Sequence, residues 1–86
     1  MPYIKKYLRE FLDEDIDGLV NKIAKMEDRT GPLAYVVYRL LRGTMPSERF
    51  KHYSSSIGVL EAVKLEFYRR KVAKYEDLKA REEGDV

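Results

Sequence analysis

Glu61 and Lys64 are the residues whose types and spacing bear most directly on chemistry. Residues three apart lie side by side on a helix, so this carboxylate and ammonium can pair. At about 100° per residue, both fall within one apolar arc, formed by Ile57, Leu60, Phe67, Tyr68 and Tyr75. A charge in an apolar setting must be paired, because burying it alone is costly. We predict a buried ion pair or an interface network that fixes packing register; the alternative is an acid in a pocket.

Glu66 lies on the opposite side of the same predicted helix, and we expect it to pair with Arg69 or Arg70, three and four residues on. A metal site of Glu61, Glu66 and His52 is disfavoured, because the two carboxylates point roughly 140° apart at helical spacing. A metal site shared between subunits is left open. We predict no metal and no cofactor, and we treat Glu61, Lys64, Glu66 and Arg70 as ion-pair or interface candidates.

The residue types that usually carry catalysis are scarce. There is no cysteine and one histidine, His52, which we expect to be solvated or capping. Ser54, Ser55 and Ser56 stand where a predicted helix needs its N-cap, and capping is the expected role. We predict that the chain is not an enzyme.

A basic middle of the chain suggests a second function. Tyr38 and Tyr53 interleave with its cations, and aromatic rings among cations are how proteins hold single-stranded nucleic acids. The candidate nucleic-acid contacts are Arg39, Arg42, Arg49, Lys51, Arg69 and Lys74. Acidic stretches flank this middle, so the competing interpretation is charge complementation within one molecule or across a dimer.

Length and composition bound the remaining possibilities. A chain of 86 residues has room for one domain, and a core this small needs support. Without cysteines for disulfides or thiolate metal sites, oligomerisation is the expected support. There is no apolar run of about 20 residues and no signal-peptide pattern, so we expect a soluble, cytoplasmic protein with no membrane association. The absence of glutamine and the 37% of charged residues are also typical of a thermophilic source.

Helical periodicity predicts an all-α fold for the single domain 1–86, a small bundle of two short helices packed on one long C-terminal helix. The first helix is expected over about 13–26, with Asp13 as N-cap, and the second over about 32–42, between Pro32 and Gly43. The long helix is expected over about 54–80. Residues 1–12 are an arm or a short helix, and residues 81–86 a flexible acidic tail.

The long predicted helix has two unlike halves. Residues 57–68 are apolar nearly all round, whereas only one apolar stripe continues after Arg69. A helix that is apolar all round must be covered on every side, and two short helices can cover only part of it. We therefore predict a homodimer or higher oligomer, a helical protein–protein interaction module. A nucleic-acid-binding accessory protein is the alternative.

Several segments carry a resemblance to a known family. They are the stretch Gly58-Val59-Leu60-Glu61-Ala62-Val63-Lys64-Leu65-Glu66-Phe67-Tyr68-Arg69-Arg70, the later Tyr75-Glu76-Asp77 and Gly84-Asp85-Val86, the opening Met1-Pro2-Tyr3-Ile4-Lys5, and Gly31-Pro32-Leu33-Ala34-Tyr35. Together they resemble an uncharacterised family of short microbial and viral helical proteins. The resemblance implies one fold and a shared surface but no activity. Lys74 stands where many relatives have a proline, so this helix is expected to continue past Tyr75.

Overall fold

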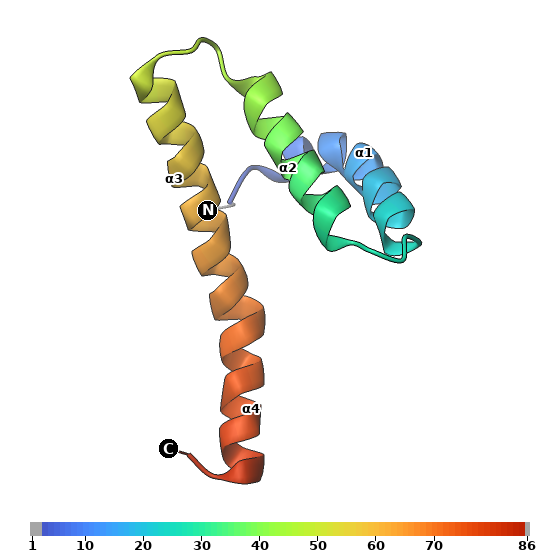
Figure 1. The fold of residues 1–86 in the computed structure, drawn as a ribbon, viewed down its shortest axis with the longest axis vertical. Helices are drawn as coiled ribbons and strands as arrows, with labels where there is room; N and C mark the ends of the chain where they lie inside the picture. Colours follow the sequence, from blue (N-terminus) through green and yellow to red (C-terminus); the bar gives the residue numbers. More distant parts are fainter. Residues whose placement is uncertain (1–2, 86) are drawn as a thin grey trace.

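Within residues 3–85 the chain folds into helices only, as predicted, and the last continuous helical stretch, residues 50–83, is the longest (Figure 1). The computed structural model describes residues 3–85; Met1, Pro2 and Val86, which belong to the predicted arm and tail, lie outside the described residues. The elements are α1 (Lys6–Ala24), α2 (Thr30–Thr44), α3 (Phe50–Phe67), the π-helical turn η1 (Tyr68–Val72) and α4 (Ala73–Glu83). We call α3, η1 and α4 together, residues 50–83, the rod.

The first helix begins earlier than its sequence signals indicate. Asp13, the predicted N-cap, lies in the middle of α1, which begins at Lys6 after an extended Lys5 with no side-chain cap. Residues 6–12 are therefore helical. The physical reason is that Leu8 and Leu12 continue the apolar stripe of Ile16 toward the N-terminus at four-residue spacing. The polar Asp13 lies outside this stripe and does not end the helix.

The second helix also extends past both predicted ends. Asp28 Oδ1 accepts a bond of 3.0 Å from the Thr30 backbone N–H, which starts α2 before Pro32. Gly43, the predicted residue just beyond the helix end, is still helical, and the Thr44 hydroxyl donates to the Leu40 carbonyl at 2.7 Å. The same hydroxyl lies 3.4 Å from the Leu41 carbonyl, one of the last four carbonyls of the helix, which have no partner within it.

The rod begins at Phe50, so the serines at 54–56 lie inside α3 and do not cap it, contrary to the prediction. At its other end, α4 continues to Glu83 and stops at Gly84, whose φ of +90° favours glycine. Residues 81–83 are thus helical, and the predicted tail shortens to the residues beyond them. Lys74 is helical and the rod passes Tyr75 without a break, as the resemblance implied.

The π-helical turn η1 is the feature of the rod that periodicity could not show. The backbone N–H of Ala73 donates to the Tyr68 carbonyl, five residues back instead of four. The extra residue turns α4 by about 100° relative to a regular helix. Tyr75 therefore does not continue the apolar arc of α3 that we assigned to it from a uniform helical wheel.

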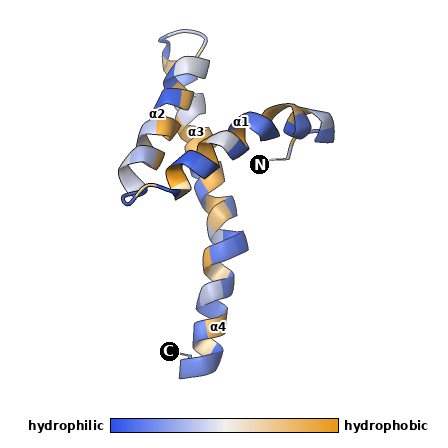
Figure 2. Cartoon of the chain, turned by 90° about the vertical axis from the view of Figure 1, so that its right-hand side faces the viewer, coloured by the Kyte–Doolittle hydropathy of each residue, from blue (hydrophilic) through white to orange (hydrophobic). Residues whose placement is uncertain are grey.

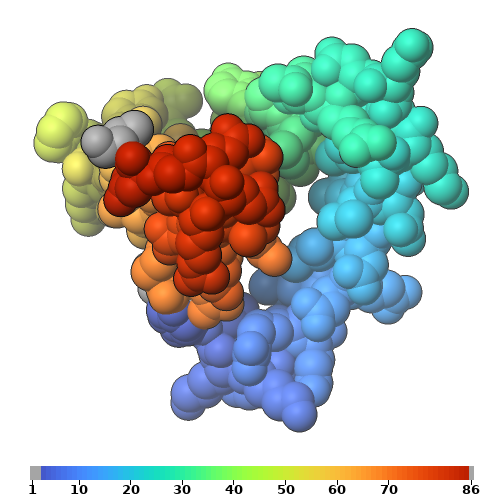
Figure 3. All heavy atoms as spheres, turned by 90° about the horizontal axis from the view of Figure 1, so that it is seen from below, coloured from blue at the N-terminus to red at the C-terminus, as the bar shows by residue number. Residues whose placement is uncertain are grey.

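The single chain is open and has no interior. None of the described residues is buried, and close backbone contacts join chiefly the consecutive parts of the rod. The radius of gyration is 16.4 Å, against about 12 Å for a compact chain of this length. Figure 3 shows open space between the rod and the light-blue to cyan part of α1, whereas the darker blue N-terminal part adjoins the rod. The two short helices do not close a bundle with the rod within one chain.

Candidate functional site

A cluster around Glu66 ties the N-terminal arm to the rod. Glu66 Oε1 accepts bonds of 2.5 Å from Arg69 Nη2 and from Arg70 Nε, as the three- and four-residue spacing predicted. The Tyr3 hydroxyl donates to the same oxygen at 2.9 Å. Both arginines also donate to that hydroxyl, at 3.1 and 3.2 Å, and Arg70 stacks 5.6 Å from the Tyr3 ring centre. One carboxylate thus organises two cations and an aromatic ring.

Tyr3 is the member of the cluster that sequence reasoning missed. It lies 63 residues from Glu66, and no local spacing rule connects positions so far apart. The side chain of Glu66 is only 16% exposed, whereas those of Arg69 and Arg70 are more than half exposed. The cluster therefore has a shielded acid and an exposed basic surface.

The bonds from Arg69, Arg70 and Tyr3 lower the pKa of Glu66 from its ordinary 4.5 to about 2, with the Arg69 bond the largest cause. The carboxylate in turn raises the pKa of Arg69, while the pKa of Arg70 is raised mainly by its bond to Tyr3 and then by Glu66. All three groups are therefore held in their charged forms over the physiological pH range.

The carboxyl of Glu66 is expected to stay ionised far into the acid range. Because its pKa is lower in the folded chain than its ordinary 4.5, its contribution to stability is present above pH 4.5 and is lost as the pH falls toward about 2. Carboxyl carbon NMR should give a Glu66 midpoint near pH 2. Glu66→Gln should abolish this titration and free the Tyr3 ring, and a midpoint near 4.5 in the unaltered chain would contradict the cluster.

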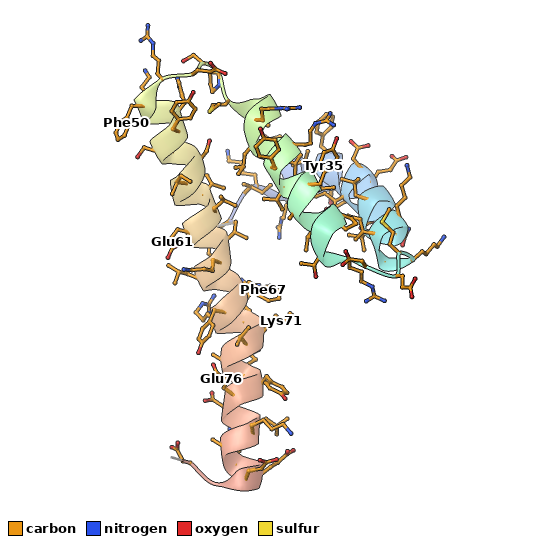
Figure 4. The ribbon with its side chains drawn as sticks, in the orientation of Figure 1. Tyr35, Phe50, Glu61, Phe67, Lys71 and Glu76 are labelled. Atoms are coloured by element: carbon orange, nitrogen blue, oxygen red, sulfur yellow. The ribbon has the colours of Figure 1, made fainter. Side chains whose placement is uncertain are left out.

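Glu61 and Lys64 form the predicted pair, with Lys64 Nζ 3.1 Å from Glu61 Oε1. Both side chains are more than half exposed, so burial of this pair does not occur within one chain. Figure 4 places Glu61 and Phe67 on different sides of the rod. A role for Glu61 and Lys64 at an interface stays a prediction.

The six candidate nucleic-acid contacts do not share one element. On α2, Arg39 lies 5.6 Å from the Tyr35 ring centre and Arg42 lies 5.4 Å from that of Tyr38. Arg49 and Lys51 flank the first residue of α3, and Arg69 and Lys74 lie at η1 and the start of α4. The contacts are spread over α2, the start of α3 and the η1 region.

Arg70, Lys71 and Lys74 share one face of the rod through three- and four-residue spacing, and the π turn adds Arg69 to them. Because this turn closes on the fifth residue, Arg69 and Lys74 come to the same side of the rod. Together with Arg70 and Lys71 they line a shallow hollow of about 360 Å³. We call these four residues the basic cluster. A neighbouring hollow of about 330 Å³ is lined by Tyr3, Arg9, Phe67 and Lys71, among others.

The larger feature of the surface is its apolar area. Large hydrophobic side chains are exposed on every helix, and Figure 2 shows orange hydrophobic positions along the first part of the rod and a largely blue α4. In the apolar half of the rod, residues 57–68, the exposed ones are Ile57, Val59, Leu60, Val63, Leu65, Phe67 and Tyr68. On α1 they include Phe11 at 79% exposure. Isolated exposed side chains are ordinary, but a continuous apolar surface marks an interaction site.

The described residues offer little for other kinds of site. Within residues 3–85, no group of three or more histidine, aspartate and glutamate side chains is placed to hold a metal ion. In the same part of the chain, no helix has the length and apolar character needed to cross a membrane.

Comparisons with known proteins place the chain by family alone. Searches of curated proteins and of solved structures found no match. Residues 1–86 match the family described as Domain of unknown function (DUF6899). The chain therefore belongs to this family, DUF6899.

Proposed function

We propose that the chain is a homo-oligomeric helical interaction module, in which a second copy covers the apolar surface that one chain leaves exposed. The observation that carries the proposal is the absence of any buried residue among residues 3–85. Ordering each residue costs roughly 1–2 kcal/mol of conformational entropy. A chain without a core has too little apolar burial to offset that cost, so the helices need a partner to stay ordered.

The exposed area supports a large interface. The described chain exposes 8049 Å², whereas a compact chain of 10.1 kDa would expose about 5,300 Å². The excess of about 2,700 Å² per chain becomes about 5,400 Å² when two copies cover each other. Permanent dimers bury about 2,000–5,000 Å² or more, so the excess matches an obligate interface and not a transient contact.

A second copy of the chain is the partner that the surface supports best. Closed two-fold dimers are the commonest soluble oligomers, and their two patches are the same surface used twice. Apolar side chains lie on α1, α2 and the rod alike, so each chain can both offer and receive apolar surface. Arg39 stacks on Tyr35 and Arg42 stacks on Tyr38. Such polar and aromatic side chains suit the hydrated rim of an interface.

The mass of the protein in solution tests this proposal. Light scattering at micromolar concentration is expected to give twice the chain mass of 10.1 kDa, or a higher multiple. A single-chain mass, with helical circular dichroism retained, would show that the chain folds alone and would refute the module.

Nucleic-acid binding is the second candidate, supported by the exposed arginine–tyrosine stacks on α2. Such stacks can hold bases, and binding through phosphates weakens steeply with salt. The candidate cations give no continuous track along one element, however. We therefore place self-association first.

A further inference from the structure

We propose that the basic cluster of one protomer receives the acidic segment of α1 from a second copy. The basic cluster is Arg69, Arg70, Lys71 and Lys74. The acidic segment is Asp13, Glu14, Asp15 and Asp17. This inference rests on the proposed self-association, and it identifies the part of each chain that selects the partner.

The basic cluster carries more positive charge than its own chain neutralises. Glu66 pairs with Arg69 and Arg70, but it supplies one negative charge against four cations. Lys71 and Lys74 have no ion pair within residues 3–85. Figure 4 shows Lys71 and Phe67 on the side of the rod that faces α1 and α2. The cluster is thus an exposed patch of like charge beside apolar surface.

Hydrogen bonds within the chain hold side chains of the basic cluster in place. Glu66 and Tyr3 fix the guanidinium groups of Arg69 and Arg70. The Tyr68 hydroxyl donates to Glu76, and this hydrogen bond links the first residue of η1 to α4. An already ordered patch loses less side-chain entropy when it binds an anionic partner.

The acidic segment has the opposite character. Its four carboxylates are exposed and have no ion pair within the described part of the chain. Asp13 and Asp17 are four residues apart and share one side of α1. Ile16, 49% exposed, and Leu12, 42% exposed, lie between and before them. The segment therefore presents apolar side chains flanked by unneutralised acids.

Other acids of the chain are less suited to this role. In α4, Glu82 and Glu83 lie 3.7 and 3.9 Å from the Lys79 ammonium, and Glu76 accepts from Tyr68. These three acids already have partners within the rod, whereas Asp13, Glu14, Asp15 and Asp17 have no ion pair within residues 3–85.

The segment and the cluster meet between copies and not within one chain. Tyr3 ties the start of α1 to the rod at Glu66, and the part of α1 nearest the cluster is basic, since Arg9 and Lys71 line the same hollow. In Figure 1, α1 then runs away from the rod. A two-fold dimer would form the contact twice, each copy giving its acidic segment to the cluster of the other.

Charge reversal in two separate chains tests the contact. One variant carries Lys71→Glu and Lys74→Glu, and the other carries Asp13→Lys and Asp17→Lys. Each alone should raise the dissociation constant of the homodimer at least about tenfold, because the substituted side chains repel the charges opposite them and the net attraction is lost. An equimolar mixture should recover affinity to within about threefold of the unaltered chain, because both contacts of the mixed dimer are again complementary.

A matched control is Lys22→Glu with Lys25→Glu, two exposed lysines with the same three-residue spacing and no ion pair in the described chain. It should leave the dissociation constant within about threefold of the unaltered value, as is usual for surface charges outside an interface. Sedimentation equilibrium at 100 mM and 500 mM salt should also show the unaltered dimer weakening with salt.

Four outcomes would overturn the inference. The variants could dimerise as well as the unaltered chain, or the mixture could fail to recover, in which case the proposed module would stand and its contact would lie elsewhere. The Lys71 and Lys74 variant could keep its dimer but lose binding to a single-stranded oligonucleotide, which would reassign the cluster to nucleic acid. A monomeric unaltered chain would refute the proposed function itself.

Discussion

Replacing Leu65 with lysine is expected to convert the proposed oligomer into a monomer that has lost most of its cooperative folding. Leu65 is 58% exposed in one chain and lies in the apolar half of the rod, where apolar side chains point in nearly every direction. Removing a buried leucine costs about 2–5 kcal/mol. A two-fold dimer contains the position twice, so a loss of about 3 kcal/mol per copy weakens association roughly 10⁴-fold.

Ser55→Lys is the matched control for this substitution. It adds the same charge to the same helix at an exposed polar position. Its effect should stay within about 0.5 kcal/mol, the usual range for surface substitutions. Analytical ultracentrifugation and thermal melts compare the two variants. Equal, small effects of Leu65→Lys and Ser55→Lys would mean that the apolar half of the rod is not an interface.

Thermal stability is expected to depend on protein concentration. When folding and association are one event, tenfold dilution removes about 1.4 kcal/mol of stability per dimer. For a folded unit of about 170 residues this corresponds to a fall in Tm of roughly 3–6 °C. A hundredfold range should therefore move the Tm by roughly 6–12 °C, which circular dichroism resolves easily.

The control for this effect is the mixture of charge-reversed chains, which should show a concentration dependence close to that of the unaltered protein. A Tm that stays constant over the hundredfold range would contradict coupled folding and association. It would mean that the single open chain is stable by itself, despite burying only about 45% of the area that its unfolded form exposes.

The helices could be predicted from the sequence, but their ends could not. The apolar spacing of Ile16, Leu19 and Ile23 identified the first helix correctly. The predicted start of this helix was wrong, because an aspartate can cap a helix or lie on the exposed face of one of its middle turns. The sequence alone does not distinguish the two positions. The serines at 54–56 misled for the same reason, since a helix that begins at Phe50 places them in its interior turns and not at its start.

The π turn had no signal in the sequence. No proline or glycine stands within residues 68–72, and the turn depends on which carbonyl the Ala73 N–H reaches. Because the turn was missed, Tyr75 was placed on the wrong side of the helical wheel, and Arg69 was placed away from Lys74, with which it lines one hollow. Any periodicity argument that crosses such a turn is offset by one residue beyond it.

In the candidate site, the contacts between neighbouring turns of a helix were predicted, and the contact between distant parts of the chain was not. The pairs Glu61–Lys64 and Glu66–Arg70 follow from local helical spacing and are present. The contact of Tyr3 with Glu66 could not be predicted, because it depends on how the N-terminal arm crosses the rod, and local spacing does not determine that path. The need for a covering partner was predicted from the all-round apolar half of the rod. It stays a prediction, and the exposed apolar side chains of α1 and α2 enlarge the surface that such a partner would cover.

The most direct test of the central claim is an isotope-filtered NOE experiment on an equimolar mixture of labelled and unlabelled chains. If a second copy covers the rod, the methyl groups of Ile57, Leu60 and Leu65 should show strong NOEs to protons of the other chain. Their amide protons should also exchange slowly. A complete set of rod assignments without any interchain NOE from these methyl groups would contradict the claim.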